Sequence, residues 1–340
     1  MTGLASLSLV WLLGCGSDPG GSTFGFVALS TDEYESIDAA PLLLAGDGLP
    51  DSVDLSGWLP PARDQGQQST CVGFVTGYAL KTYQEARERA WDVRDESHQF
   101  SPSFIFNRTH QGCTVGSTMR DALELLRTTG CMTIDTAPYD AENPEGCQEG
   151  LGVNDDEAAE EFRIQSWKRI AANDLEQVKA YLAAGVPVPI GIRVYPQWEE
   201  LRDAGSNALY DSSGGEKLAS HAVLAIGYDD DRQAIRIFNS YGSEWGDEGF
   251  AWILYDLWPE IILEAYIAQD FIESGSQDGG VPRYKGLSRQ TRVKIARFPS
   301  VTLWNSKAAL REAGHRTPSF GLRSVVLRPR STTCSANWQA

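Results

Sequence analysis

The sequence predicts an α+β protein of two lobes, in which a helical half precedes a β-rich half. Three observations support this prediction: 42% of the 340 residues are hydrophobic, apolar residues recur at helical spacing up to about residue 160, and short runs of Val, Ile and aromatic residues follow. A chain of this length can bury a large core. We expect an active-site cleft between the two lobes.

Three helices are predicted in the first half. Residues 69–89 carry apolar side chains at helical spacing, and Ser69 or Thr70 can cap the start of this helix. Residues 100–110 begin a helix after a Ser-Pro pair, and residues 118–128 begin one with capping-box spacing. The first of these helices therefore has a cysteine in its first turn.

Five strands and a short helix are predicted in the second half. The strand segments are rich in β-branched and aromatic residues and are bounded by Gly, Pro or Asp: 162–170, 186–194, 221–228, 234–238 and 250–255. Residues 174–184 form an amphipathic pattern that stops at Gly185, which predicts a helix between the first two strands.

The N-terminus resembles the apolar half of a secretory signal. Its apolar run is too short to span a bilayer and ends in Leu12-Leu13-Gly14-Cys15, which is similar to a bacterial lipobox. We therefore expect a signal or lipobox-like segment at 1–15, a lipid tether on Cys15, a linker at 16–49, and export to an extracellular or periplasmic face. No Lys or Arg precedes the run, so either the true start lies upstream or the export interpretation fails.

The net charge of −17 is distributed unevenly. Residues 276–340 contain 12 of the 29 Lys/Arg and 2 of the 46 Asp/Glu, which leaves 17 basic and 44 acidic residues in 1–275. The acidic body would repel phosphates, so we expect no nucleic-acid partner. Residues 274–340 are predicted to be a basic, poorly ordered tail.

Three short motifs carry the chemistry. In DQGQQSTCVGF, Gln65-Gly66 lies six residues before Cys71 at the predicted helix start. In SHAVLAIGYDD, His221 opens an apolar strand, and in IFNSYGSEWGDEGFAWI, Asn239 ends the next strand. Each fragment alone has a bland interpretation, such as a buried thiol or a turn, but all four residues occur in one order.

Together these motifs resemble the papain-like cysteine peptidases, over roughly residues 50–273. The order Gln, Cys, His, Asn is kept, with 150 residues from Cys71 to His221 and 18 from there to Asn239. The resemblance implies a papain-like two-lobe fold, with a helical lobe at about 65–160 and an antiparallel, barrel-like β lobe at about 161–273. It also implies a monomer that hydrolyses peptide or protein substrates without a metal or cofactor.

The resemblance implies a role for each of the four residues. Cys71 at a helix N-terminus would be a thiolate nucleophile, paired with His221, which later protonates the leaving amine. Asn239 would orient the imidazole, and Gln65 would donate to the oxyanion together with the Cys71 N–H. A thioester on Cys71 would be the intermediate.

Further positions follow from the resemblance less directly. Gly116 is similar to a glycine whose backbone pairs with extended substrate. Tyr241 replaces a tryptophan that shields the His–Asn hydrogen bond, and Trp245 matches a second tryptophan. Little helical periodicity lies between Cys15 and residue 51, so we do not expect latency through a helical pro-region.

The cysteines and the departures from the family leave several possibilities open. The partner that Cys113 resembles is absent, so it pairs elsewhere or stays free, and Cys113, Cys131, Cys147 and Cys334 allow several pairings. Two rival functions also remain: a binding module that has lost catalysis, and a transferase that resolves the same thioester with an amine.

Overall fold

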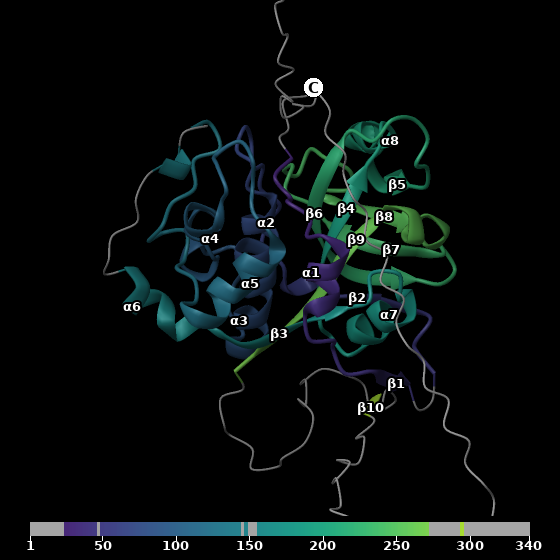
Figure 1. The fold of residues 1–340 in the computed structure, drawn as a ribbon, viewed down its shortest axis with the longest axis horizontal. Helices are drawn as coiled ribbons and strands as arrows, with labels where there is room; N and C mark the ends of the chain where they lie inside the picture. Colours follow the sequence, from purple (N-terminus) through teal and green to yellow (C-terminus); the bar gives the residue numbers. More distant parts are fainter. Residues whose placement is uncertain (1–23, 46–47, 144–145, 149–154, 272–292, 296–340) are drawn as a thin grey trace, which may run out of the picture. The chain divides into compact units, whose positions relative to one another are not determined.

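The structure is a computed structural model that describes residues 24–45, 48–143, 146–148, 155–271 and 293–295 (Figure 1). Helices come first and a large sheet follows, which confirms the predicted α+β class. None of the helices in the described ranges is both long and apolar enough to cross a bilayer. The expectations for segment 1–15, for Cys15 and Cys334, and for almost all of the basic tail lie outside the described residues.

The helix that begins at Cys71 runs through the centre of the helical lobe in three parts. It consists of α2 (Cys71–Gly73), a π-helical segment (Phe74–Lys81) and α3 (Thr82–Arg89). The predicted side-chain cap by Ser69 or Thr70 is wrong, because the Thr70 hydroxyl lies 2.8 Å from the Tyr139 hydroxyl instead.

Two further helices pack against this central helix. α4 (Pro102–Thr109) is capped by Ser101, and α5 (Met119–Thr128) is capped by Thr118, which accepts a hydrogen bond from the Asp121 N–H. Their buried faces join the central helix in one hydrophobic cluster. A disulfide joins Cys113 to Cys147, which settles the pairing of these two cysteines, while Cys131 is a buried free thiol.

The second lobe is built on an eight-stranded sheet. Seven strands follow the order β3 (Ile164–Ile170), β9 (Ile262–Asp270), β4 (Val188–Val194), β6 (Ala219–Asp229), β7 (Ala234–Phe238), β8 (Phe250–Leu254) and β5 (Leu209–Tyr210), and β2 (Ser52–Asp54) pairs with β6. All these pairs are antiparallel except β5 with β8. The two end strands of this order, β3 and β5, do not pair with each other, so the sheet is open. The expected antiparallel sheet is present, but it does not close into a barrel.

Short helices and one long-range strand pair complete the domain. α7 (Leu175–Ala183) is the helix predicted at 174–184, with Asp174 as its N-cap. The others are α6 (Asp155–Ala159), α8 (Gln197–Glu200) and α9 (Trp258–Ile261), and β1 (Leu43–Ala45) pairs with β10 (Val293–Ile295). The buried Lys81 joins the two lobes through an ion pair of 2.8 Å with Asp270 on β9.

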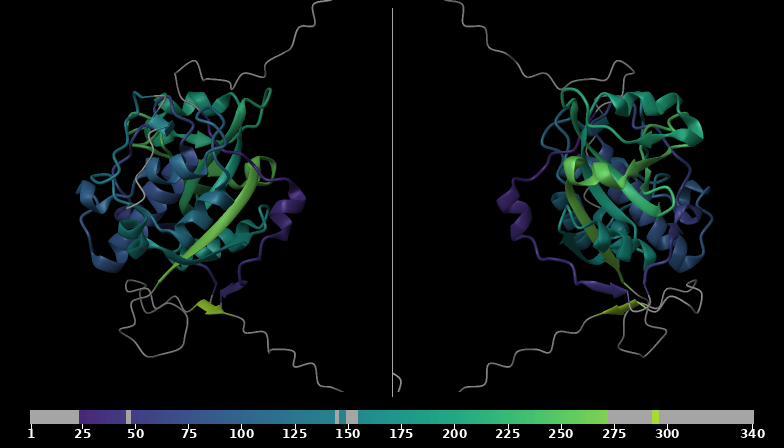
Figure 2. Two further views of the ribbon diagram at one scale, coloured as in Figure 1. Left: turned by 60° about the vertical axis from the view of Figure 1, so that its left-hand side comes forward. Right: turned by 90° about the vertical axis from the view of Figure 1, so that its right-hand side faces the viewer.

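The segment before residue 46 differs from the expected linker. It carries the helix α1 (Thr31–Ser36), whose N-cap Ser30 forms a complete capping box with Glu33, and it buries the side chain of Tyr34. Figure 2 shows this purple segment running along the outer side of the domain. Residues 24–45 are therefore an ordered part of the fold.

Candidate active site

The structure brings the four predicted site residues together. Cys71 starts α2 and packs in one buried cluster with Ala222, the neighbour of His221 on β6. His221 Nε2 lies 2.8 Å from Asn239 Oδ1. The Gln65 backbone N–H donates to the carbonyl oxygen of Ser240, which follows Asn239, over 2.8 Å. The lobes thus meet at one cluster of polar side chains.

The hydrogen bond to Asn239 fixes the tautomer of the neutral imidazole. An amide oxygen only accepts, so the Nε2 of His221 carries the hydrogen and Nδ1 carries the lone pair. His221 Nδ1 is buried and has no hydrogen-bond partner in the described part of the chain. This nitrogen is therefore the one that can accept a proton from a thiol.

Ser240 holds the side chain of Gln65, a contact that the sequence reasoning missed. The Ser240 hydroxyl donates to Gln65 Oε1 over 2.5 Å, and Gln65 Nε2 donates to the carbonyl oxygen of Gln68 over 2.9 Å. The amide of Gln65 is therefore held in one orientation. The signal for this contact in the sequence is Ser240 directly after Asn239 in the Asn-Ser-Tyr-Gly motif.

Burial disfavours charge on both Cys71 and His221. It raises the pKa of the Cys71 thiol from 9.0 to about 11, although backbone hydrogen bonds from Ala222 and Gly25 act in the opposite direction. It lowers the pKa of His221 from 6.5 to about 4, with the Asn239 hydrogen bond acting in the opposite direction. Both shifts act against the ion pair between Cys71 and His221 that the resemblance implies, and that ion pair stays a prediction.

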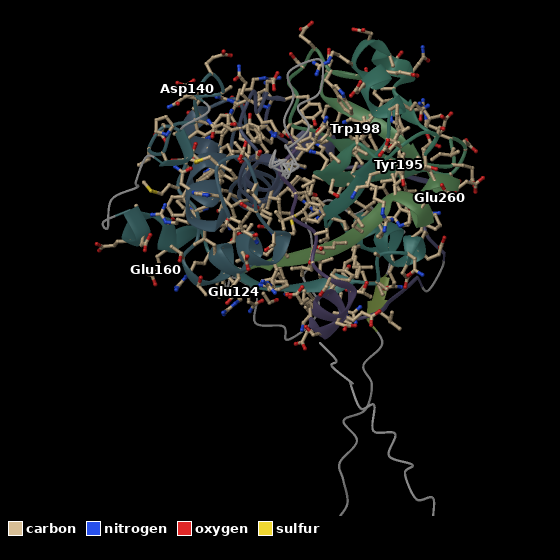
Figure 3. All side chains as sticks on the ribbon, turned by 45° about the horizontal axis from the view of Figure 1, so that its top comes forward. Glu124, Asp140, Glu160, Tyr195, Trp198 and Glu260 are labelled. Carbon is tan, nitrogen blue, oxygen red and sulfur yellow. A yellow bond between two sulfur atoms is a disulfide. The ribbon has the colours of Figure 1, made fainter. Side chains whose placement is uncertain are left out.

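Aromatic rings surround the imidazole. The Tyr241 ring lies 5.0 Å from that of His221, and Trp245 meets Tyr241 edge-on at 6.0 Å. Trp198 of α8 also meets His221 edge-on, at 5.8 Å, and Figure 3 shows Trp198 near Tyr195 on the β-rich side. Sequence reasoning missed Trp198, because nothing in its local sequence links it to the histidine.

The N-terminal segment covers this site. We call residues 24–29 the strap. The ring of Phe24 meets His221 edge-on at 5.7 Å, and the Ser117 N–H, next to Gly116, donates to the carbonyl oxygen of Gly25 over 2.9 Å. Cys71 and His221 each have 0% exposure. No local periodicity marks the strap, which lies within the predicted linker at 16–49.

The profile of the papain family cysteine proteases matches residues 49–265. The chain belongs to this family. Cathepsin K of Gallus gallus is 27% identical over 197 residues, which are 57% of this chain and 55% of that protein. Gamete and mating-type specific protein A of Dictyostelium discoideum is 26% identical over 202 residues, 58% of this chain and 41% of that protein. The chain thus spans about half the length of these papain-family relatives.

Solved structures share the fold. Xylellain, a cysteine protease from Xylella fastidiosa, aligns with a TM-score of 0.61 at 22% identity, over 74% of this chain and 97% of xylellain. Procathepsin L 3 of Tenebrio molitor aligns with a TM-score of 0.55 at 21% identity, over 68% of this chain and 73% of that protein. The strap precedes the region that matches the papain family.

Proposed function

We propose that this chain is a cysteine peptidase that cleaves peptide bonds through a thioester on Cys71. The observation that carries the proposal is the hydrogen bond between His221 and Asn239 in a papain-family domain, where Cys71 starts a helix and packs with Ala222. A thiol, a neutral imidazole and an orienting amide are the groups that acyl transfer needs.

The tautomer of His221 supports the following proton transfers. The Cys71 thiol passes its proton to Nδ1 of His221 as the sulfur attacks the substrate carbonyl carbon. The C–N bond then breaks, and the proton on Nδ1 goes to the leaving amine. A water molecule next adds to the thioester and gives a proton to Nδ1, which returns it to the sulfur as the acid product leaves.

The oxyanion that forms in both additions needs donors. The Cys71 backbone N–H and Nε2 of Gln65 are the donors we assign, since the Ser240 hydroxyl fixes the Oε1 side of the Gln65 amide and so aims its nitrogen. Water that returns to the site when the strap leaves lowers the cost of charge on both reacting groups. The thiolate then becomes easier to form than in the covered arrangement.

The same thioester leaves the transferase alternative open, because an amine can replace water in the second half of the reaction. Product analysis with and without an added amine separates the two. The lipid on Cys15, the export of the chain and its monomeric state stay predictions from the sequence.

The experiment uses a variant in which the strap cannot seat. A methyl group at residue 25 would lie 1.9 Å from the carbonyl oxygen of Ser69, so Gly25→Ala should leave Cys71 open. We expect this variant to hydrolyse peptides and to be labelled by an epoxide probe for papain-like enzymes. Adding Cys71→Ala or His221→Ala should abolish both, whereas adding Cys131→Ser should abolish neither. A folded Gly25→Ala variant whose Cys71 is alkylated but which cleaves no peptide would support the binding-module alternative.

A further inference from the structure

The strap is seated against the backbone of the helical lobe. Ser117 N–H donates to the Gly25 carbonyl oxygen, and Val27 N–H donates to the Ser117 carbonyl oxygen, both over 2.9 Å, so that the strap runs parallel to residues 116–117. Gly25 has no room for a side chain here. A methyl group on it would meet the Ser69 backbone, and one on Gly116 would lie 1.9 Å from the Gly25 oxygen.

The side chains of the strap fill space on the sheet side. Phe26 is 6% exposed and belongs to the same hydrophobic cluster as Cys71 and Ala222. A methyl group on Gly191 of β4 would lie 2.2 Å from the Phe26 ring, so the ring occupies the space that this glycine leaves. Phe24 covers the imidazole of His221. The strap therefore closes the site from both lobes.

An extended peptide cannot approach the sulfur while the strap is in place. Cys71 and His221 are both fully buried, and the backbone N–H and carbonyl oxygen of Ser117 are already hydrogen-bonded to the strap. The strap also lies directly against Gly116, the glycine that the resemblance links to substrate. A substrate and the strap thus compete for the same space beside Cys71.

Residues 30–45, which we call the anchor, are joined to the β-rich lobe in a different way. The hydroxyl of Tyr34, which is 7% exposed, shares its one hydrogen between the carbonyl oxygens of Ile170 and Ala265 and accepts from the Ala265 N–H over 2.9 Å. The guanidinium of Arg169 donates to the carbonyl oxygens of Ile37 and Glu35. These bonds tie the anchor to β3 and β9.

The far end of the anchor is also held by side chains. The Gln177 amide exchanges two hydrogen bonds with the backbone of Leu43, and the Tyr181 hydroxyl donates to the carbonyl oxygen of Pro41. Leu43 is counted among the buried residues of the β-rich core. Loss of the anchor would therefore expose core side chains and leave buried polar groups unpaired, whereas the strap blocks only the site.

We propose that the strap is a resident inhibitor: it swings out of the site about the junction of Leu29 and Ser30 while the anchor stays folded, so the enzyme is activated with no part of the chain removed. This inference rests on the proposed peptidase function. At the junction, the Leu29 N–H donates to the Glu264 carboxylate over 2.5 Å, and Ser30 caps α1. The strap ends and the anchor begins at these two residues.

The test compares the full chain with Gly25→Ala, and uses Gly57→Ala as the matched control because no atom lies within 4 Å of a methyl group there. Three quantities are measured: the alkylation rate of Cys71 by iodoacetamide, resolved by peptide mapping, the rate of peptide hydrolysis, and the intact mass. The added methyl group in Gly25→Ala should displace the strap and raise the rate of Cys71 alkylation by about 10- to 100-fold, while the intact mass shows that no part of the chain has been removed. Gly57→Ala should behave like the wild type.

The outcomes test the inhibitory strap and the proposed peptidase function separately. Equal alkylation of Cys71 in wild type and Gly25→Ala would overturn the inference, and so would faster alkylation found only on chains that have lost the anchor. Faster alkylation of an intact chain without hydrolysis would support the strap and reject the peptidase. If circular dichroism shows Gly25→Ala to be unfolded, Phe26→Ala replaces it, and the same gain in Cys71 alkylation is expected.

Discussion

The buried imidazole of His221 links the stability of the covered domain to pH. Burial lowers its pKa to about 4, while the unfolded chain keeps the ordinary value of 6.5. Between these values the unfolded chain binds a proton that the folded chain does not. The stability is therefore complete above pH 6.5 and is lost as the pH falls towards 4. One pKa unit corresponds to about 1.4 kcal/mol, so the loss through this residue is about 3 kcal/mol.

His221→Gln isolates this contribution, because glutamine does not titrate and can still donate to Asn239. The free energy of unfolding is measured in urea at pH 7.5 and at pH 4 for both proteins. Carboxyl groups titrate in both, so their contribution cancels when the two changes are subtracted. We expect the wild type to lose about 3 kcal/mol more than the variant.

An equal loss in the two proteins would refute this reasoning, because it would mean that His221 is neither desolvated nor held neutral in the folded chain. The Gly25→Ala variant provides a second check. Opening the strap removes Phe24 from the imidazole, so the extra loss in acid should shrink when the strap cannot seat.

Three further predictions concern the site, the anchor and the disulfide. In the Gly25→Ala background, Gln65→Ala should lower kcat by about 100- to 1000-fold with little change in KM, because a hydrogen-bond donor to the oxyanion is lost. An unchanged kcat would show that Gln65 does not stabilise the oxyanion. Tyr34→Phe should lower the free energy of unfolding by about 2–4 kcal/mol, because its hydroxyl has three buried backbone partners. The control Tyr228→Phe, whose hydroxyl donates to the carbonyl oxygen of Pro50, should lower it by about 1 kcal/mol. Similar losses in the two variants would contradict the special attachment of the anchor. The disulfide between Cys113 and Cys147 links residues that are 34 positions apart in the sequence. Its reduction should lower the free energy of unfolding in urea by about 3–4 kcal/mol. A loss below about 1 kcal/mol would argue that the disulfide does not stabilise the fold.

Local patterns predicted the elements that hold the site. β7 has the predicted bounds, and the central helix and α7 begin and end within two residues of the predicted positions. Each of these segments has its own hydrophobic periodicity and is bounded by residues that end a helix or strand. The resemblance to the papain-like peptidases predicted that Cys71, His221 and Asn239 share one site. In the structure His221 is hydrogen-bonded to Asn239, and Cys71 packs with Ala222, the neighbour of His221.

The missed features depend on contacts that no local pattern contains. β9 places Glu264 inside a buried strand, which breaks the apolar run that would mark it, and the carboxylate is used instead to hold Leu29. The strap has only six residues, too few for a periodic pattern. What defines it is the lack of room at Gly25 and Gly191, which arises from residues far away in the sequence.

The covalent continuity of the strap and the anchor has a quantitative consequence. A short tether of this kind holds its inhibitor near the site at an effective concentration of roughly millimolar. On the proposed function, dilution would therefore not activate the enzyme, and a short peptide that binds weakly would not displace the strap at low concentration. A long, extended polypeptide that exchanges many contacts at once would do so, and substrate length would then select what is cleaved.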